Sequence, residues 1–156
     1  MKPLSQIEKS FFLKKIKIFA DLDFDLLLAI AEKLHHDEYD QYEKVFSIGQ
    51  AANRMYLIVQ GVVEILDVEM RPIFELKPGE FFGDESIFNE QPRSYFAVCK
   101  TDPHLLALSR SHLLSVISEC PSVAVALLQS YAHPLSCRFR SMINFAGDSC
   151  DFRYNR

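Results

Sequence analysis

The chain has 156 residues, the length of one domain with appended helices rather than of two domains. Hydrophobic residues make up 49% of it and glycine occupies only 5 positions, so a sizeable core is expected, and disorder or a collagen-like repeat is excluded. The net charge of −4 argues against broad nonspecific binding to nucleic acid, although it leaves a local basic patch open.

Two helices of opposite charge are expected at the start of the chain. Residues 1–18 carry five lysines against one acid, whereas residues 21–43 carry eight acids against one lysine. In the first helix an apolar face is expected opposite the lysines, and it consists of Ile7, Phe11, Phe12, Ile16 and Phe19. We favour a helix docked on the domain, with Lys9, Lys14 and Lys17 in water, over a membrane-surface helix.

The second helix is expected to begin at the N-cap Asp23 and to end near His35. Its buried face would consist of Leu26, Leu27, Ile30, Ala31 and Leu34.

Short β-type runs then recur about every ten residues, with glycine and proline between them. The runs are Val45–Phe46, Met55–Val59, Val62–Leu66, Ile73–Leu76, Tyr95–Cys99 and Leu105–Leu108. Many short, regularly punctuated strands are typical of an antiparallel barrel or sandwich.

Helical spacing returns at Leu113, and a last helix is expected from Pro121 until Pro134 ends or kinks it. We therefore divide the chain into N-terminal helices (1–35), a β-barrel (36–109), C-terminal helices (110–145) and a tail (146–156) that is expected to be disordered.

Cysteine and histidine indicate no metal site. The cysteines have no CxxC spacing and are expected to be reduced thiols, with Cys99 in the core; a regulatory disulfide among Cys120, Cys137 and Cys150 is the alternative. His35 and His36 would point to opposite faces of a strand, and His104, His112 and His133 are interpreted as isolated. No run of 18 apolar residues or signal peptide is found, so a cytoplasmic protein without a membrane span is expected.

The residues from Pro78 to Lys100 form a polar insert between two strands. If Asp84 to Phe88 make one helical turn opened by Gly83, their free N–H groups favour an anion such as phosphate. Arg93 could reach the same anion, and Ser94 or Ser86 could add a hydroxyl. A carboxylate there fits only beside neutral donors such as a sugar diol, so phosphate plus ribose is the implied ligand.

This run resembles the phosphate-binding cassette of cyclic nucleotide-binding domains, the family of the cyclic AMP receptor and the protein kinase A regulatory subunit. The family pattern Phe-Gly-Glu followed by Pro-Arg-Ala or Pro-Arg-Ser reads here Phe82-Gly83-Asp84 and Pro92-Arg93-Ser94. The resemblance covers about residues 19–133. It implies an α+β fold, with an eight-stranded antiparallel jelly-roll-like β-barrel flanked by N-terminal and C-terminal helices.

The resemblance also implies roles for individual residues. Arg93 would bind the cyclic phosphate, the amides around Glu85 and Ser86 its other oxygens, and Asp84 the ribose 2′-hydroxyl. The family usually has Glu at position 84 and small residues after Ser94, where this chain has Tyr95-Phe96. These rings could stack on a purine or fill its space. The expected ligand-binding residues are Phe82, Gly83, Asp84, Glu85, Ser86, Arg93 and Ser94.

The expected function is a sensor that binds cAMP or cGMP and couples binding to movement of the C-terminal helices, with no catalytic residues, cofactor or metal. The alternative is a nucleotide-free barrel in which Arg93 pairs with Asp84 or Glu85. Such a module would contact a protein partner or a second copy through the helix from Val123 to Tyr131. DNA binding by this chain is not expected, because about twenty residues after Pro134 are too few for a three-helix DNA-binding unit.

Overall fold

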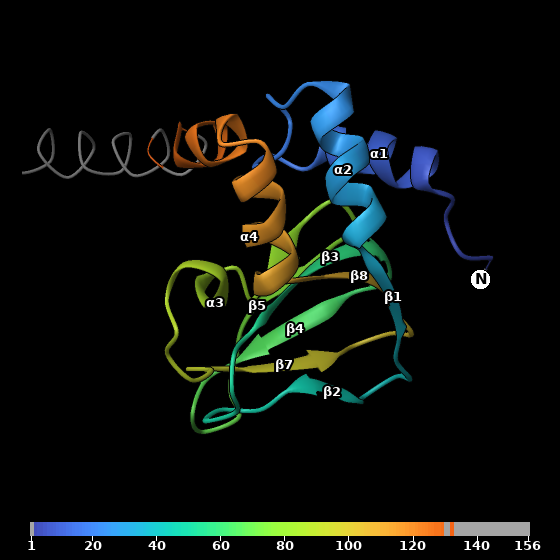
Figure 1. Ribbon diagram of the computed structural model, residues 1–156. Helices are drawn as coiled ribbons and strands as arrows, with labels where there is room; N and C mark the ends of the chain where they lie inside the picture. The colour runs from blue at the N-terminus through green and yellow to red at the C-terminus, as the bar shows by residue number, and fades with distance from the viewer. Residues whose placement is uncertain (1, 130–131, 133–156) are drawn as a thin grey trace, which may run out of the picture.

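The computed structural model describes residues 2–129 and 132 (Figure 1). Helices α1, α2 and α4 gather over one end of the strands, and α3 lies to one side (Figure 1). In chain order the elements are α1 (Gln6–Lys15), α2 (Phe24–Lys33), β1 (His35–Glu38), β2 (Lys44–Phe46), β3 (Arg54–Gln60), β4 (Val63–Leu66), β5 (Pro72–Leu76), β6 (Phe81–Phe82), α3 (Glu85–Phe88), β7 (Phe96–Cys99), β8 (His104–Ser109) and α4 (Arg110–Glu119).

The described strands form two antiparallel four-stranded sheets, ordered β1-β8-β3-β6 and β2-β7-β4-β5. Antiparallel sheets with flanking helices are confirmed, and the expected jelly-roll-like β-barrel is corrected in one respect: the described strands form two separate sheets and no closed barrel. β6 ends one sheet and β5 ends the other. β6 has only two residues, and four of the five residues of β5 are exposed.

The strands β3 and β8 lie between two apolar cores. On one face Met55 and Leu57 of β3 join Leu106 and Leu108 of β8 in a core with the helices. On the opposite face the alternate residues of both strands meet Phe46, Val63, Ile65 and Ala97 of the other sheet. Burial on both faces explains why β3 and β8 read as continuous apolar runs rather than as alternating ones.

The sequence predicted the strands β2, β3, β4, β5, β7 and β8 and missed two: β1, which is polar, and β6, which has only two residues. β1 is the polar segment His35–Glu38, and it is held by pairing along its whole length with β8. β6 pairs with β3 through Phe81 and Phe82. β1 therefore depends on its partner strand rather than on its own composition, and β6 is too short to be recognised from a run of residues.

The apolar face expected in the first helix is only partly correct. α1 ends at Lys15; within it Ser10 and Leu13 are buried, while Ile7 and Phe11 are exposed. Ile16 and Phe19 are buried, but in the turns that follow the helix. The difference arises because α1 turns a lysine-bearing side toward α2.

Two lysines of α1 bond to backbone rather than standing only in water, which corrects the expectation for Lys9 and Lys14. Lys9 Nζ donates to the carbonyl of Leu34 at 2.7 Å, and Lys14 Nζ donates to that of Leu22 at 3.0 Å. These carbonyls flank α2, so the lysines join the two helices. α2 begins after Asp23 and buries Leu27, Ile30 and Ala31, in agreement with the prediction.

After α4 a further helix is described over Ser122–Gln129, bent by 119° from α4. Among the described residues no single helix is long and apolar enough to cross a membrane; this bent pair passes only when taken together, which is weak support for a span. The predictions for Pro134, His133, Cys137, Cys150 and the tail 146–156 lie outside the described residues.

Cys99 is buried as a free thiol, as predicted, and burial raises its pKa to about 12. A thiol held protonated in this way is a poor nucleophile and metal ligand.

Candidate functional site

The segment between β6 and β7 forms the predicted helical turn. α3 is a single turn that begins after Asp84, and Gly83 precedes it with φ of +73°. Glycine is required here, because an added Cβ would stand 2.7 Å from Arg93 Nη1 and 3.1 Å from the carbonyl of Arg54. The turn is therefore fitted closely around the guanidinium of Arg93.

Arg93 is 3% exposed and is surrounded by oxygen acceptors. Nη1 donates to the carbonyl of Gly83 at 3.1 Å and Nη2 to that of Arg54 at 2.5 Å. The guanidinium also lies 4.0 Å from the centroid of the Phe46 ring. Its Nε is buried and has no hydrogen-bond partner in the described structure, so one donor of this cation is unused.

Glu85 provides the anionic partner of Arg93. Its Oε1 accepts from Arg93 Nη1 at 3.1 Å, and its Oε2 accepts from the Tyr95 hydroxyl at 3.2 Å. The Tyr95 hydroxyl in turn accepts from the Gly83 N–H at 3.0 Å. Burial, and then the negative charge of Glu85, raises the pKa of Tyr95, which keeps the hydroxyl available as a donor.

Arg93, Glu85 and Tyr95 form a hydrogen-bonded group that we call the Arg93 cluster. A cavity of about 370 Å³ opens beside this cluster. Aromatic and aliphatic side chains line most of it, and two acids and a tyrosine hydroxyl lie at its polar end. The lining residues are Ile65, Ile73, Phe74, Leu76, Phe81, Phe82, Asp84, Glu85 and Tyr95. Arg93 is not among them, but it contacts the lining residue Glu85, which in turn bonds to the lining residue Tyr95.

The structure brings most of the predicted site residues together. Phe82, Asp84 and Glu85 line the cavity, Gly83 and Arg93 lie behind them, and Ser94 is exposed. The side chain of Ser86 is outside what the structure describes. The Arg93–Glu85 pair matches the alternative of an ion-paired arginine, yet the cavity has not collapsed.

Sequence reasoning missed the contacts that Tyr95 and Phe46 make with this cluster. Tyr95 was expected to stack on a base or to fill its space; it lines the cavity and also bonds to Glu85. The available signal was spacing, since residues two apart on an extended chain face the same side, as Arg93 and Tyr95 do. Phe46 reaches Arg93 from β2, and local sequence carries no signal for that contact.

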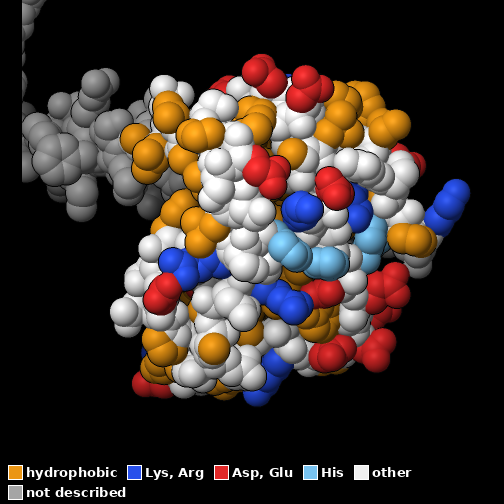
Figure 2. All heavy atoms as spheres, viewed as in Figure 1, with side chains coloured by type: hydrophobic (Ala, Val, Ile, Leu, Met, Phe, Trp, Pro, Cys, Tyr) orange, Lys and Arg blue, Asp and Glu red, His pale blue; other side chains and the backbone are white. Residues whose placement is uncertain are grey.

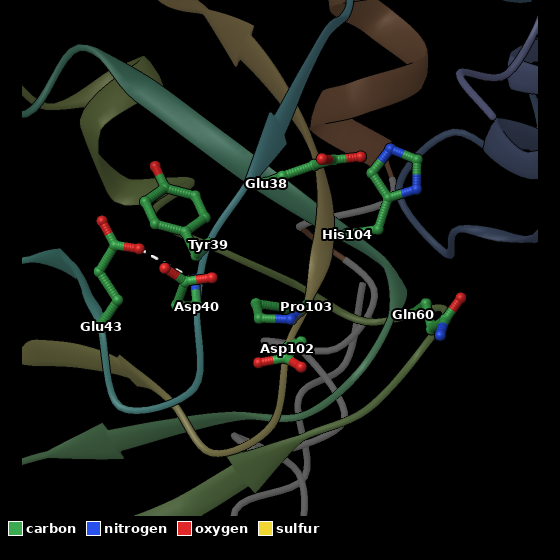
Figure 3. Close-up of a pocket in the computed structure, with 8 residues that line it drawn as sticks. All are labelled: Glu38, Tyr39, Asp40, Glu43, Gln60, Asp102, Pro103 and His104. Carbon is green, nitrogen blue, oxygen red and sulfur yellow. Dashed lines mark hydrogen bonds between the residues drawn. The ribbon is translucent and has the colours of Figure 1, made fainter. Parts of the chain in front are cut away.

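A second cavity, of about 350 Å³, lies near the end of β1 and is acidic (Figure 3). Two of its carboxylates already stabilise turns. Glu43 accepts from the N–H of Asp40 at 2.9 Å, and Asp102 accepts from that of Gln41 at 2.7 Å. Among the described residues no group of three or more His, Cys, Asp or Glu is arranged to hold a metal ion.

Four of the histidines form two pairs, which corrects the interpretation of His104 and His112 as isolated. His36 Nδ1 lies 2.6 Å from His104 Nε2, and the rings of His35 and His112 are 5.4 Å apart. Figure 2 shows histidine side chains gathered near the middle of one face. The pairs form because β1 lies along β8 and close to α4, a placement that the local sequence does not reveal.

Comparison with known proteins agrees with this geometry. At 27% identity the chain resembles a CRP-like cAMP-activated global transcriptional regulator of Mycobacterium tuberculosis, over 79% of the chain and 57% of that protein. It is 36% identical to the cyclic AMP receptor protein of Thermus thermophilus over 55% of the chain and 42% of that protein. The matched region thus spans about half the length of these relatives, 57% of one and 42% of the other.

Solved structures share the fold. The N-terminal domain of a Streptomyces coelicolor transcriptional regulator superposes with a TM-score of 0.76 at 25% identity, covering 84% of this chain and 94% of that one. The catabolite activator protein of Thermus thermophilus gives 0.68 at 29% identity, covering 83% and 63%. The family profile described as "Cyclic nucleotide-binding domain" matches residues 36–120, from β1 to the end of α4. This match spans more than half of the chain, which belongs to the cyclic nucleotide-binding domain family.

Proposed function

We propose that this chain is a sensor module that binds a cyclic nucleotide, cAMP or cGMP, in the cavity beside α3. The observation that carries the proposal is the buried guanidinium of Arg93, which has an unused Nε donor and lies directly behind the polar end of the cavity. A buried N–H without an acceptor favours a ligand that supplies one, and a cyclic phosphate has oxygens to do so.

The remaining cavity residues fit a nucleoside. Asp84 at the polar end would accept from the ribose 2′-hydroxyl, a neutral donor that a carboxylate can face without repulsion. Phe74, Phe81 and Tyr95 offer aromatic surfaces for a purine. The amides at positions 85 and 86 would complete the phosphate contacts, and Ser94 is the weakest member of the expected set because it is exposed. In this proposal the chain is a cytoplasmic regulator rather than an enzyme.

Binding would reach the C-terminal helices through α3. Ile87 of α3 is buried in the same core as Leu113 and Val116 of α4. Arg110, the first residue of α4, donates from Nε to the carbonyl of Ile87 at 3.1 Å and pairs with Glu90 after α3. A displacement of α3 by the ligand would therefore shift α4 through these contacts.

Thermal unfolding with and without millimolar cAMP or cGMP tests the proposal. At one hundred times its Kd a ligand stabilises the fold by about 2.7 kcal/mol. That corresponds to a rise of roughly 5–11 °C in Tm for a domain of this size. Arg93→Ala should abolish the rise, whereas Arg71→Ala, which removes an exposed arginine of the β4–β5 turn, should keep it. No rise with either nucleotide would contradict the proposal.

One observation favours a second candidate, an interaction module that needs no nucleotide. Leu114, Val125 and Leu128 are exposed apolar residues of the C-terminal helices, and Leu128 is 67% exposed. A second copy or a protein partner could cover them. In size-exclusion chromatography Leu128→Asp should then disrupt an assembly that Arg93→Ala leaves intact; an elution volume unchanged by Leu128→Asp counts against this interface.

A further inference from the structure

We propose that Glu85 is an internal competitor of the ligand phosphate: its carboxylate occupies Arg93, Tyr95 holds it there, and a cyclic nucleotide must displace it. This inference rests on the proposed function. It assigns Glu85 a role opposite to that of a ligand-binding residue, because its side chain would oppose binding while its backbone amide could still assist.

The contacts of Glu85 account for both of its oxygens. One accepts from Arg93 and the other from the Tyr95 hydroxyl, so the side chain is held at two points in front of the guanidinium. Tyr95 is fixed in turn by the Gly83 N–H. The carboxylate is therefore placed by a small network rather than by one ion pair.

A carboxylate and a phosphate compete for this position for electrostatic reasons. Both are anions that form charge-assisted hydrogen bonds to the same guanidinium, and side by side they would repel each other. The other described acceptors of Arg93 are the neutral carbonyls of Gly83 and Arg54, which can remain when a ligand binds. Glu85 is thus the partner whose departure a phosphate requires.

Glu85 can leave Arg93 because its side chain is partly exposed to solvent. Its side chain is 37% exposed, whereas that of Arg93 is 3% exposed. A carboxylate that turns from Arg93 toward the cavity mouth regains water, while the arginine cannot leave without a large desolvation change. The moving part would be the Glu85 side chain and the single turn of α3.

In this arrangement the apparent affinity equals the intrinsic affinity multiplied by the fraction of molecules in which Glu85 has left Arg93. Removing the charge of Glu85 without changing its shape should raise that fraction. We expect Glu85→Gln to bind cAMP about tenfold more tightly than the unmodified protein, and Tyr95→Phe about threefold more tightly, because it loses one of the two holding contacts.

Isothermal titration calorimetry of the full chain with cAMP, and separately with cGMP, measures these affinities. The matched control is Glu32→Gln, which removes the same charge from the exposed side of α2 and should leave Kd unchanged. Arg93→Ala reports whether binding uses the site at all, and circular dichroism of each variant verifies folding. If Arg93→Ala does not fold, Arg93→Lys replaces it, since Lys keeps the charge and loses the forked geometry.

The outcomes separate this inference from the function on which it rests. Tighter binding by Glu85→Gln but not by Glu32→Gln, or binding by Glu85→Gln where the unmodified protein shows none, supports it. Equal or weaker binding by Glu85→Gln, with clear binding by the unmodified protein, overturns the competitor and leaves the sensor standing. Absence of binding in every folded variant, including Glu85→Gln, overturns both.

Discussion

Arg93 and His104 are both almost fully buried, at 3% and 5% exposed, but the protein accommodates them in opposite ways. Arg93 keeps its charge, as arginine does in proteins, and is given oxygen acceptors from two separate segments, at Gly83 and Arg54. His104 is disfavoured as a cation: burial, and then the positive charge that His36 can carry, lowers its pKa, and Glu38 opposes this only in part.

The hydrogen bonds between His36 and His104 show why protonation of His104 is disfavoured. The carbonyl of Leu4 lies 3.3 Å from His36 Nε2, so that nitrogen serves best as a donor. His36 Nδ1 then accepts from His104 Nε2, and His104 Nδ1 is left unprotonated, buried and without a partner among the described residues. An added proton would rest on that Nδ1 with no acceptor. The Arg93 cluster is thus built to hold an ion, and the histidine pair to exclude one.

The largest effect is expected from breaking the Arg93 cluster through its backbone. Gly83→Ala adds a Cβ 2.7 Å from Arg93 Nη1 at a positive φ, and Gly49→Ala adds one in open space at a similar φ. Backbone strain costs about 1–2 kcal/mol at either site, and we expect Gly83→Ala to lose roughly another 1–3 kcal/mol through displacement of the guanidinium. Urea denaturation measures both; equal losses would show that the guanidinium adjusts freely.

An intermediate effect is expected from pH. Because the pKa of His104 is lowered on folding, the unfolded chain binds more protons just below pH 6.5. The free energy of unfolding is therefore full above that pH and falls as the pH decreases, by at most about 1.4 kcal/mol per unit for one proton. His104→Gln, which keeps a donor for His36, should flatten this slope in denaturant titrations at pH 7.5 and 5.5. An unchanged slope would assign the effect to other groups.

The smallest effect concerns a cation at the edge of the helical core. Lys9 donates to the carbonyl of Leu34, directly before β1, and partial burial lowers its pKa. Lys9→Met keeps the aliphatic stem and loses the hydrogen bond, so we expect a loss of about 1 kcal/mol in unfolding free energy. Lys15→Met on the exposed side of α1 is the matched control, and equal losses in the two variants would argue against the Lys9 contact.

Sequence alone predicted what is local. Periodicity located both N-terminal helices and six strands, and the cassette motif placed Gly83 and Arg93 around one helical turn. The contacts that set the charges around Arg93 and His104 depend instead on the three-dimensional path of the chain. Glu85 meets Arg93 because of how the turn is wound, and His36 meets His104, 68 residues away, because of the β1–β8 register.

The missed features share a physical cause. β1 has no apolar alternation and is held in place by pairing with β8, and the division of the strands into two sheets likewise depends on which strands pair. Strand partnership is a property of the whole chain, and a motif that spans a dozen residues cannot report it.

The double burial of β3 and β8 has a consequence for cooperativity. Because one pair of strands forms a wall of both apolar cores, neither core can lose its packing without exposing the other. The helical layer and the two sheets should therefore melt in a single transition, with no stable half-folded species. A nucleotide bound beside α3 would then stabilise the distant N-terminal helices as much as its own cavity, since all of them unfold in one step.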